Sequence, residues 1–281
     1  LGGCHIAPLK NLGQPAPKIG LALGSGAAHG FAHIGVLKAL EAQGIHPDFI
    51  AGTSAGSVVG AIYASGHAPL EVQRMALEMD ESQIADWGLP SRGFLKGEAL
   101  AAYVNRVVSN RPLEKLKIPL AVVATDLKTG TMKVFRNGNA GQAVRASSAV
   151  PTIFRPVEIQ GGEYVDGGLV SPVPAGVARD MGATFVIAVD IGDKPTDNKV
   201  SSALDVFWQT WAIMGRSLAR HDLKHADIVV RPNLVDVSAT DFKGKNRAIL
   251  EGEAAVARVL PELRSKLQAA GWRPRERIAQ R

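Results

Sequence analysis

Cysteine is nearly absent from this chain of 281 residues, which contains only Cys4. A single cysteine excludes an internal disulfide and any metal site built from several thiolates. Long apolar runs are also missing, since no stretch reaches the roughly 18 residues of a membrane-spanning helix. Aromatic residues make up 5%, and no aromatic-rich basic patch of the kind that binds nucleic acid stands out. We therefore expect neither a spanning helix nor a nucleic-acid partner.

The positive charge lies mainly at the C-terminal end of the sequence. Residues 258–281 hold seven basic and two acidic side chains, which accounts for most of the net charge of +6. We interpret residues 268–281 as a basic tail. Such a tail is either a solvated extension or a contact for anionic lipid.

The first residues, Leu1-Gly2-Gly3-Cys4, resemble the end of a bacterial lipoprotein signal, where small residues precede a cysteine that is lipidated after cleavage. The charged and apolar parts of such a signal do not occur in this sequence. Residues 1–17 are interpreted as a tether, proline-rich after Cys4. Two locations stay open. One is a membrane-associated lipoprotein that faces the periplasm, if Cys4 is lipidated, and the other is the cytoplasm.

Predicted strands and helices alternate along residues 18–267. Short apolar runs indicate strands within 18–26, 47–52, 118–127, 183–192 and 226–232. Apolar residues at helical spacing indicate helices over 31–44, 55–66, 69–79, 97–109, 202–222 and 245–267. A hairpin is expected within 158–168, with Gly161-Gly162 at its turn. The alternation predicts one α/β domain with a mostly parallel sheet that is covered on both faces.

The segment Gly52-Thr53-Ser54-Ala55-Gly56 joins a predicted strand to a predicted helix. Gly-x-Ser-x-Gly in that context is typical of a nucleophilic serine, because its glycines permit a tight turn that lifts the hydroxyl away from the backbone. The following helix N-terminus favours nearby negative charge. The alternative is that Ser54 only caps the helix.

A glycine-rich turn at residues 24–30, Gly-Ser-Gly-Ala-Ala-His-Gly, follows the first predicted strand. Turns at the carboxyl ends of adjacent parallel strands converge, so this turn can offer N–H groups to an oxyanion beside Ser54. The competing interpretation is a loop that binds dinucleotide phosphates. That fingerprint needs a third glycine at position 29, where this chain has His29, with Gly30 one position later.

Several residues are candidates for the proton acceptor of Ser54. A Ser-Asp-His triad can be written with Asp166 and either His221 or His225. The two histidines are four residues apart on one predicted helix face, which is typical of surface or packing residues, and a paired-histidine metal site lacks a further ligand. Asp166 precedes Gly167-Gly168 at the end of a short predicted strand. Its carboxylate could act directly only if burial raises its basicity; otherwise Asp166 belongs to a turn.

Four separated stretches occur together and in order in this chain, which thereby resembles the bacterial patatin-like phospholipases. They are LALGSGAAHGFAHIGVLKALE, GTSAGSVVGAIYASG, RASSAVPTIFRPV and YVDGGLVSPVP. The resemblance covers about residues 18–265. It implies a three-layer α/β/α fold with a mostly parallel central sheet, and it places His221 and His225 away from the chemistry.

The resemblance also implies a Ser-Asp dyad without histidine. Ser54 corresponds to the nucleophile, Asp166 to its base, and the backbone of Gly24, Ser25, Gly26 and Ala27 to the oxyanion hole. The remaining motif glycines are Gly30, Gly52, Gly56, Gly167 and Gly168. The implied reaction is hydrolysis of fatty-acyl esters of (lyso)phospholipids or other lipids through an acyl-enzyme, without metal, nucleotide or other cofactor. The alternatives are an acyltransferase on the same site and a non-catalytic lipid-binding regulator.

The glycine-rich turn departs from the family pattern at three positions, and a later predicted helix carries a group of large apolar residues. Ser25 and Ala27 stand where glycine is usual, although their backbone N–H groups are kept, and His29 stands where the family usually has arginine or lysine. In the predicted helix over 202–222, apolar residues at near-helical spacing form either core packing, or a lip of the acyl pocket or a membrane-facing surface. These residues are Phe207, Trp208, Trp211 and Met214.

Overall fold

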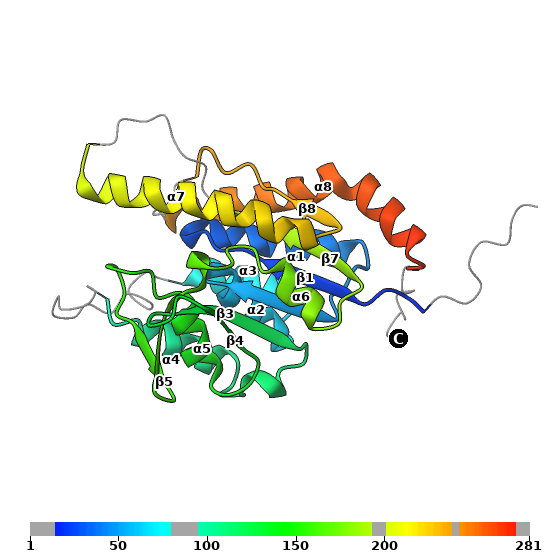
Figure 1. Cartoon of the computed structure of the whole chain (residues 1–281). Helices are drawn as coiled ribbons and strands as arrows, with labels where there is room; N and C mark the ends of the chain where they lie inside the picture. The colour runs from blue at the N-terminus through cyan, green and yellow to red at the C-terminus, as the bar shows by residue number, and fades with distance from the viewer. Residues whose placement is uncertain (1–14, 80–94, 193–200, 238–241, 274–281) are drawn as a thin grey trace, which may run out of the picture.

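The computed structural model describes residues 15–79, 95–192, 201–237 and 242–273 (Figure 1). Its strands form one sheet in the order β5-β6-β3-β2-β1-β7-β8, and β4 pairs with β3 off this path. The strands are β1 (Ile19–Leu23), β2 (Phe49–Thr53), β3 (Leu120–Asp126), β4 (Met132–Phe135), β5 (Val157–Ile159), β6 (Gly162–Asp166), β7 (Phe185–Val189) and β8 (Ile228–Val230). Pairing is parallel from β3 through β2, β1 and β7 to β8. It is antiparallel where β3 meets β4 and β6, and where β6 meets β5.

Helices cover both faces of this sheet. They are α1 (Phe31–Ala42), α2 (Ala55–Ala64), α3 (Pro69–Glu78), α4 (Glu98–Val107), α5 (Ala140–Ser147), α6 (Ala175–Asp180), α7 (Ala203–Asp222) and α8 (Lys245–Ala269). One buried cluster joins the sheet to α1, α2, α3, α4, α5 and α8, and a second, smaller cluster joins the opposite face to α6 and α7. The three-layer α/β/α fold with a mostly parallel sheet is therefore confirmed.

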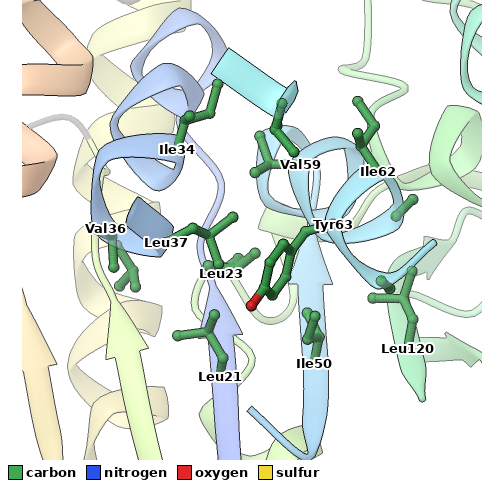
Figure 2. Packing of buried hydrophobic residues seen from close by; sticks show 14 of the residues in the cluster. Leu21, Leu23, Ile34, Val36, Leu37, Ile50, Val59, Ile62, Tyr63 and Leu120 are labelled. Atoms are coloured by element: carbon green, nitrogen blue, oxygen red, sulfur yellow. The ribbon is translucent and has the colours of Figure 1, made fainter. Parts of the chain in front are cut away.

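The two faces of the sheet carry side chains of different size. Leu21, Leu23 and Ile50 lie in the larger cluster, where Figure 2 shows them beneath α1 and α2. Their neighbours Ala22 and Ala51 lie in the smaller cluster. Because side chains alternate along a strand, the small residues let α6 lie close to the sheet while the large ones fill the space below α1 and α2.

The predicted helices match α1, α2, α3, α4, α7 and α8 to within two residues at each end, and each predicted strand contains or overlaps an observed one. Sequence reasoning missed β4, α5 and α6, which are short. The hairpin forms, but the predicted position of its turn is wrong by one residue. Gln160 and Gly161 have positive φ angles of 51° and 81°, and Gly162 already pairs with Ile159.

The outer parts of the predicted organisation are only partly described. Cys4 and most of the predicted tether lie outside the described residues, as do residues 274–281 of the basic tail. Within the described part, α8 continues to Ala269, two residues past the predicted domain end, and no helix there is long and apolar enough to cross a membrane.

Candidate active site

Ser54 occupies a strained position between β2 and α2. Its backbone angles are φ 53° and ψ −123°, outside the regions that a non-glycine residue prefers. The flanking glycines allow this turn to fit. A Cβ on Gly52 would lie 2.7 Å from the Gly56 carbonyl oxygen, and one on Gly56 would collide with the Leu23 carbonyl. Although Ser54 is the N-cap residue of α2, its side chain makes no capping hydrogen bond. The interpretation of its hydroxyl as only a helix cap is therefore wrong.

A second serine, Ser147 at the end of α5, supports this turn. The Ser54 N–H donates to Ser147 Oγ at 2.8 Å, and Ser147 Oγ donates in turn to the Val123 carbonyl of β3. Ser147 is fully buried. It lies within the RASSAVPTIFRPV stretch, but sequence reasoning gave it no role because α5 was not predicted and the contact spans 93 positions.

Asp166 reaches the same region from β6. It pairs with Ala124 of β3, while Val123 pairs with Thr53 on the other side of β3, so the residue after Thr53 and the carboxyl of Asp166 lie at one level of the sheet. Gly167 permits this approach, because a Cβ there would lie 3.0 Å from the Thr53 side chain and collide with the Val123 carbonyl. The structure therefore brings the two predicted dyad residues together.

Burial changes the chemistry of the Asp166 carboxyl. Its side chain is 1% exposed, and this burial raises its pKa from 3.8 to about 7. The Gly168 N–H, which donates to Oδ1 at 2.7 Å, acts in the opposite direction, and the Ser54 hydroxyl does so to a lesser degree. The Ser54 contact falls short of a formed hydrogen bond, since Oδ2 is buried without a donor among the described residues.

The glycine loop after β1 packs directly against the start of α2. A Cβ on Gly30 would lie 2.7 Å from the Ala55 Cβ. The N–H groups of Gly24 and Ser25 donate to the carbonyls of Val189 and Pro172, at 3.1 and 2.8 Å. These two groups are therefore not free for an oxyanion, which corrects that half of the predicted set.

Three backbone N–H groups of the glycine loop and of the start of α2 are without an acceptor within the described residues. Those of Gly26 and Ala27 donate no hydrogen bond within the described residues. Ala27 has a positive φ of 47°, so the chain is bent sharply here. The Ala55 N–H is free as well, because it opens α2. Sequence reasoning missed Ala55, although the residue after the nucleophile is a usual oxyanion donor.

One family model matches the part of the chain that contains the glycine loop, Ser54 and Asp166. The family model for patatin-like phospholipases matches residues 21–179, which extend from β1 to α6. This is more than half of the chain and includes the glycine loop, Ser54 and Asp166.

The chain belongs to the patatin-like phospholipase family. An uncharacterised NTE family protein of Mycobacterium tuberculosis is 37% identical over 188 residues, which are 66% of this chain and 52% of that protein. The patatin-like phospholipase domain-containing protein 6 of Homo sapiens is 34% identical over 203 residues, which are 69% of this chain and 15% of that protein. The chain thus spans about half the length of its mycobacterial relative.

A solved structure supports the fold independently. The chain is similar to VipD from Legionella pneumophila, with a TM-score of 0.61 at 16% sequence identity, over 88% of this chain and 67% of that one. At this identity the likeness bears on the fold alone.

Two buried histidines of this patatin-like chain hold the glycine loop in place. His29 places Nδ1 3.1 Å from the Ile191 carbonyl oxygen and Nε2 2.7 Å from that of Val237. The His29 ring thus anchors the loop to two distant segments. His33 of α1 donates from Nε2 to the Gly24 carbonyl at 2.8 Å, and burial lowers the pKa of its ring to about 4.

The other two candidate histidines lie elsewhere. His221 and His225 are exposed at the end of α7 and in the turn that follows, with ring centroids 6.3 Å apart. His225 faces Gly176 of α6. Neither forms a hydrogen bond with Ser54 or Asp166, and within the described residues no third potential ligand joins them in a metal site. The arrangement supports surface and packing roles for both.

Proposed function

We propose that this chain is a serine acyl hydrolase that cleaves fatty-acyl esters of (lyso)phospholipids or other lipids with a Ser54–Asp166 dyad. The observation that carries the proposal is a buried carboxyl whose pKa is raised to about 7, facing a serine on a strained turn. A carboxylate of ordinary basicity is a poor base at neutral pH, whereas one with a pKa near 7 is well matched to that task.

In the first half of the reaction, Asp166 removes the Ser54 hydroxyl proton as Oγ attacks the ester carbonyl carbon. The carbonyl oxygen becomes an oxyanion, held by the N–H groups of Gly26, Ala27 and Ala55. When the intermediate collapses, the bond to the alcohol oxygen breaks. Asp166 returns its proton to that oxygen, and the acyl group stays on Ser54.

In the second half, Asp166 takes a proton from water as the water oxygen attacks the acyl carbon. The bond to Ser54 Oγ breaks, the serine regains a proton from Asp166, and the fatty acid leaves. Both halves use only groups of this chain and water, so the proposal needs no cofactor.

We also propose a membrane partner and a location for this chain. A membrane surface is the expected source of lipid substrate. Lipidation of Cys4, which would place the enzyme on a membrane facing the periplasm, concerns a residue outside the described ones.

Substitution of the dyad tests the function. Ser54→Ala and Asp166→Asn should each lower hydrolysis of a short-chain ester and of a lipid panel at least about a thousandfold, because each removes a group that reacts. A fluorophosphonate should label the wild type at Ser54. The His221→Ala/His225→Ala double variant is the control, with activity expected to be unchanged and all proteins melting cooperatively.

The outcomes separate the alternatives. Retained activity in Ser54→Ala would remove Ser54 from its role, and a loss of several hundredfold in the histidine variant would restore the triad. An acyl ester formed with an added alcohol, in place of free fatty acid, would identify a transferase. A folded wild type that is neither labelled nor active on any lipid would favour the non-catalytic regulator.

A further inference from the structure

The first half of α7 presents an apolar surface to solvent. Residues 206–215 contain no charged side chain. Three large apolar side chains of this segment are about half exposed, namely Val206 at 54%, Ile213 at 53% and Met214 at 48%. Asp205, just before the segment, is occupied in the capping box of α7 with Ser202. The first half of α7 therefore exposes a group of apolar side chains of the kind that marks an interaction surface.

Three aromatic side chains lie behind this surface. Phe207, Trp208 and Trp211 are half-buried, and none of them belongs to either buried core cluster. The Phe207 ring centroid lies 5.2 Å from that of Trp208 and 5.9 Å from that of Trp211. The interpretation of these residues as ordinary core packing is therefore not supported.

The aromatic group touches the candidate active site. A Cβ built on Gly168 would lie 3.4 Å from Cζ2 of Trp211 and 3.0 Å from Oδ1 of Asp166. Trp211 thus lies against the residue whose N–H holds the proposed base. Trp211 therefore links α7 directly to the segment beside the dyad.

The first charges that follow this surface along α7 are positive. Arg216 and Arg220 follow on the next turns of α7; both are exposed, and neither forms an ion pair within the described residues. In Figure 1 the first turns of α7, in yellow, extend to the side of the sheet away from the C-terminus. Aliphatic and tryptophan side chains followed by arginines suit the boundary between acyl chains and anionic headgroups.

We propose that residues 206–215 of α7 dock onto an anionic lipid bilayer and pass an acyl chain along Trp211 toward Ser54. The inference rests on the proposed function, since it assigns that site the surface through which lipid reaches it. A bilayer is favoured over a protein partner because Trp211 links this segment to a site proposed for acyl esters, and because two exposed arginines follow the segment.

A triple variant, Val206→Ser/Ile213→Ser/Met214→Ser, tests the proposal. It changes only exposed side chains that do not touch the dyad. We expect flotation with phosphatidylcholine–phosphatidylglycerol vesicles, and hydrolysis of lipid in them, to fall at least about tenfold, while turnover of a soluble short-chain ester stays within about twofold. The matched controls are Leu70→Ser on α3 and Leu250→Ser on α8, which remove side chains 68% and 62% exposed. Both should float like the wild type.

Vesicle flotation tests the docking surface, and ester hydrolysis tests the proposed function, so the two proposals can be rejected separately. Equal flotation of the triple variant and the wild type would overturn the docking surface, as would a wild-type dimer that the triple variant dissociates, because the face would then be covered by a second copy. A wild type that floats but hydrolyses no ester would remove the proposed function and leave the docking result in place.

Discussion

At the scale of single residues, Ser54 and Asp166 are each held in the fold at a free-energy cost, which is backbone strain for Ser54 and loss of solvent for Asp166. The backbone of Ser54 is strained, and its hydroxyl makes no capping hydrogen bond to α2. Asp166 loses its solvent, and the burial that raises its pKa to about 7 also makes the charged form costly in the fold. Both costs are placed at the site where the proposed chemistry needs them.

The pH dependence of turnover follows from the Asp166 pKa. The base must be ionised, so kcat/KM for a soluble ester should rise with pH, with a midpoint near the value of about 7, and flatten above it. A pH series with the wild type measures this midpoint. A profile already flat from pH 5 upward would mean that a group of ordinary carboxyl pKa, or none, is the base.

Stability should change with pH in the opposite direction. Between the unfolded pKa of 3.8 and the folded value of about 7, the folded state holds a proton on Asp166 that the unfolded state has released. The free energy of unfolding therefore falls as pH rises through this window. Asp166→Asn lacks this loss, so its stability relative to wild type should be about 4 kcal/mol greater at pH 8 than at pH 4.

Thermal melts of both proteins at the two pH values measure the effect. Comparing them at equal pH cancels the contribution of His33, whose lowered pKa acts equally on both. A difference in melting temperature that does not change with pH would contradict the buried, proton-holding carboxyl.

At the scale of elements, the end of α7 fastens the segment that follows the dyad aspartate. Asp222 Oδ2 accepts hydrogen bonds from Ser171 Oγ at 3.1 Å and from the Val173 N–H at 3.0 Å. The Ser171 carbonyl accepts a bond from Thr53 Oγ1 at 2.8 Å. Because Thr53 precedes Ser54, these bonds connect α7 to both sides of the proposed dyad.

This connection makes Asp222 a positioning residue. Asp222→Ala should lower kcat about tenfold with little change in KM, because the loop and the turn lose a shared anchor. Asp222→Asn should recover most of the activity, since its amide oxygen still accepts a bond from the Val173 N–H. Steady-state kinetics on a soluble ester measure both. Wild-type kcat in the alanine variant, or an asparagine variant as slow as alanine, would contradict this role.

At the scale of the whole molecule, α1 and α8 cross almost backbone to backbone. A Cβ on Gly35 would collide with the Ile249 carbonyl, and one on Gly252 would collide with the Ala32 carbonyl. This crossing ties the C-terminal helix to α1, which follows the glycine loop and carries His33. A residue near position 250 thereby supports a loop near position 25.

Gly252→Ala should destabilise the fold by about 2–4 kcal/mol, because the helices must move apart to admit one methyl group. Gly215→Ala is the matched control, since it lies in α7 with open space around it and should be neutral or slightly stabilising. Guanidinium unfolding midpoints measure both. Equal midpoints for the two variants would mean that the crossing adjusts without cost.

The local features of this protein could be predicted from the order of its residues alone. The alternation of strands and helices gave the fold class, and the glycines around Ser54 and after the first strand identified the two turns of the site. These features are readable because they depend on neighbours in the chain, through side-chain periodicity and backbone freedom. Short elements such as α5 and α6 escaped, since few residues in them repeat any pattern.

Which groups of the site are able to act depends on the folded arrangement of the chain. The sequence left Asp166 open between a base and a turn residue, and burial beside β3 is what raises its pKa to about 7. Two of the four predicted oxyanion donors are bonded to the carbonyls of Pro172 and Val189, more than a hundred positions away, and in the described part of the chain only the N–H groups of Gly26 and Ala27 lack an acceptor among the four. Basicity and hydrogen-bond capacity depend on what surrounds a group in space, and folding sets those surroundings from distant parts of the chain.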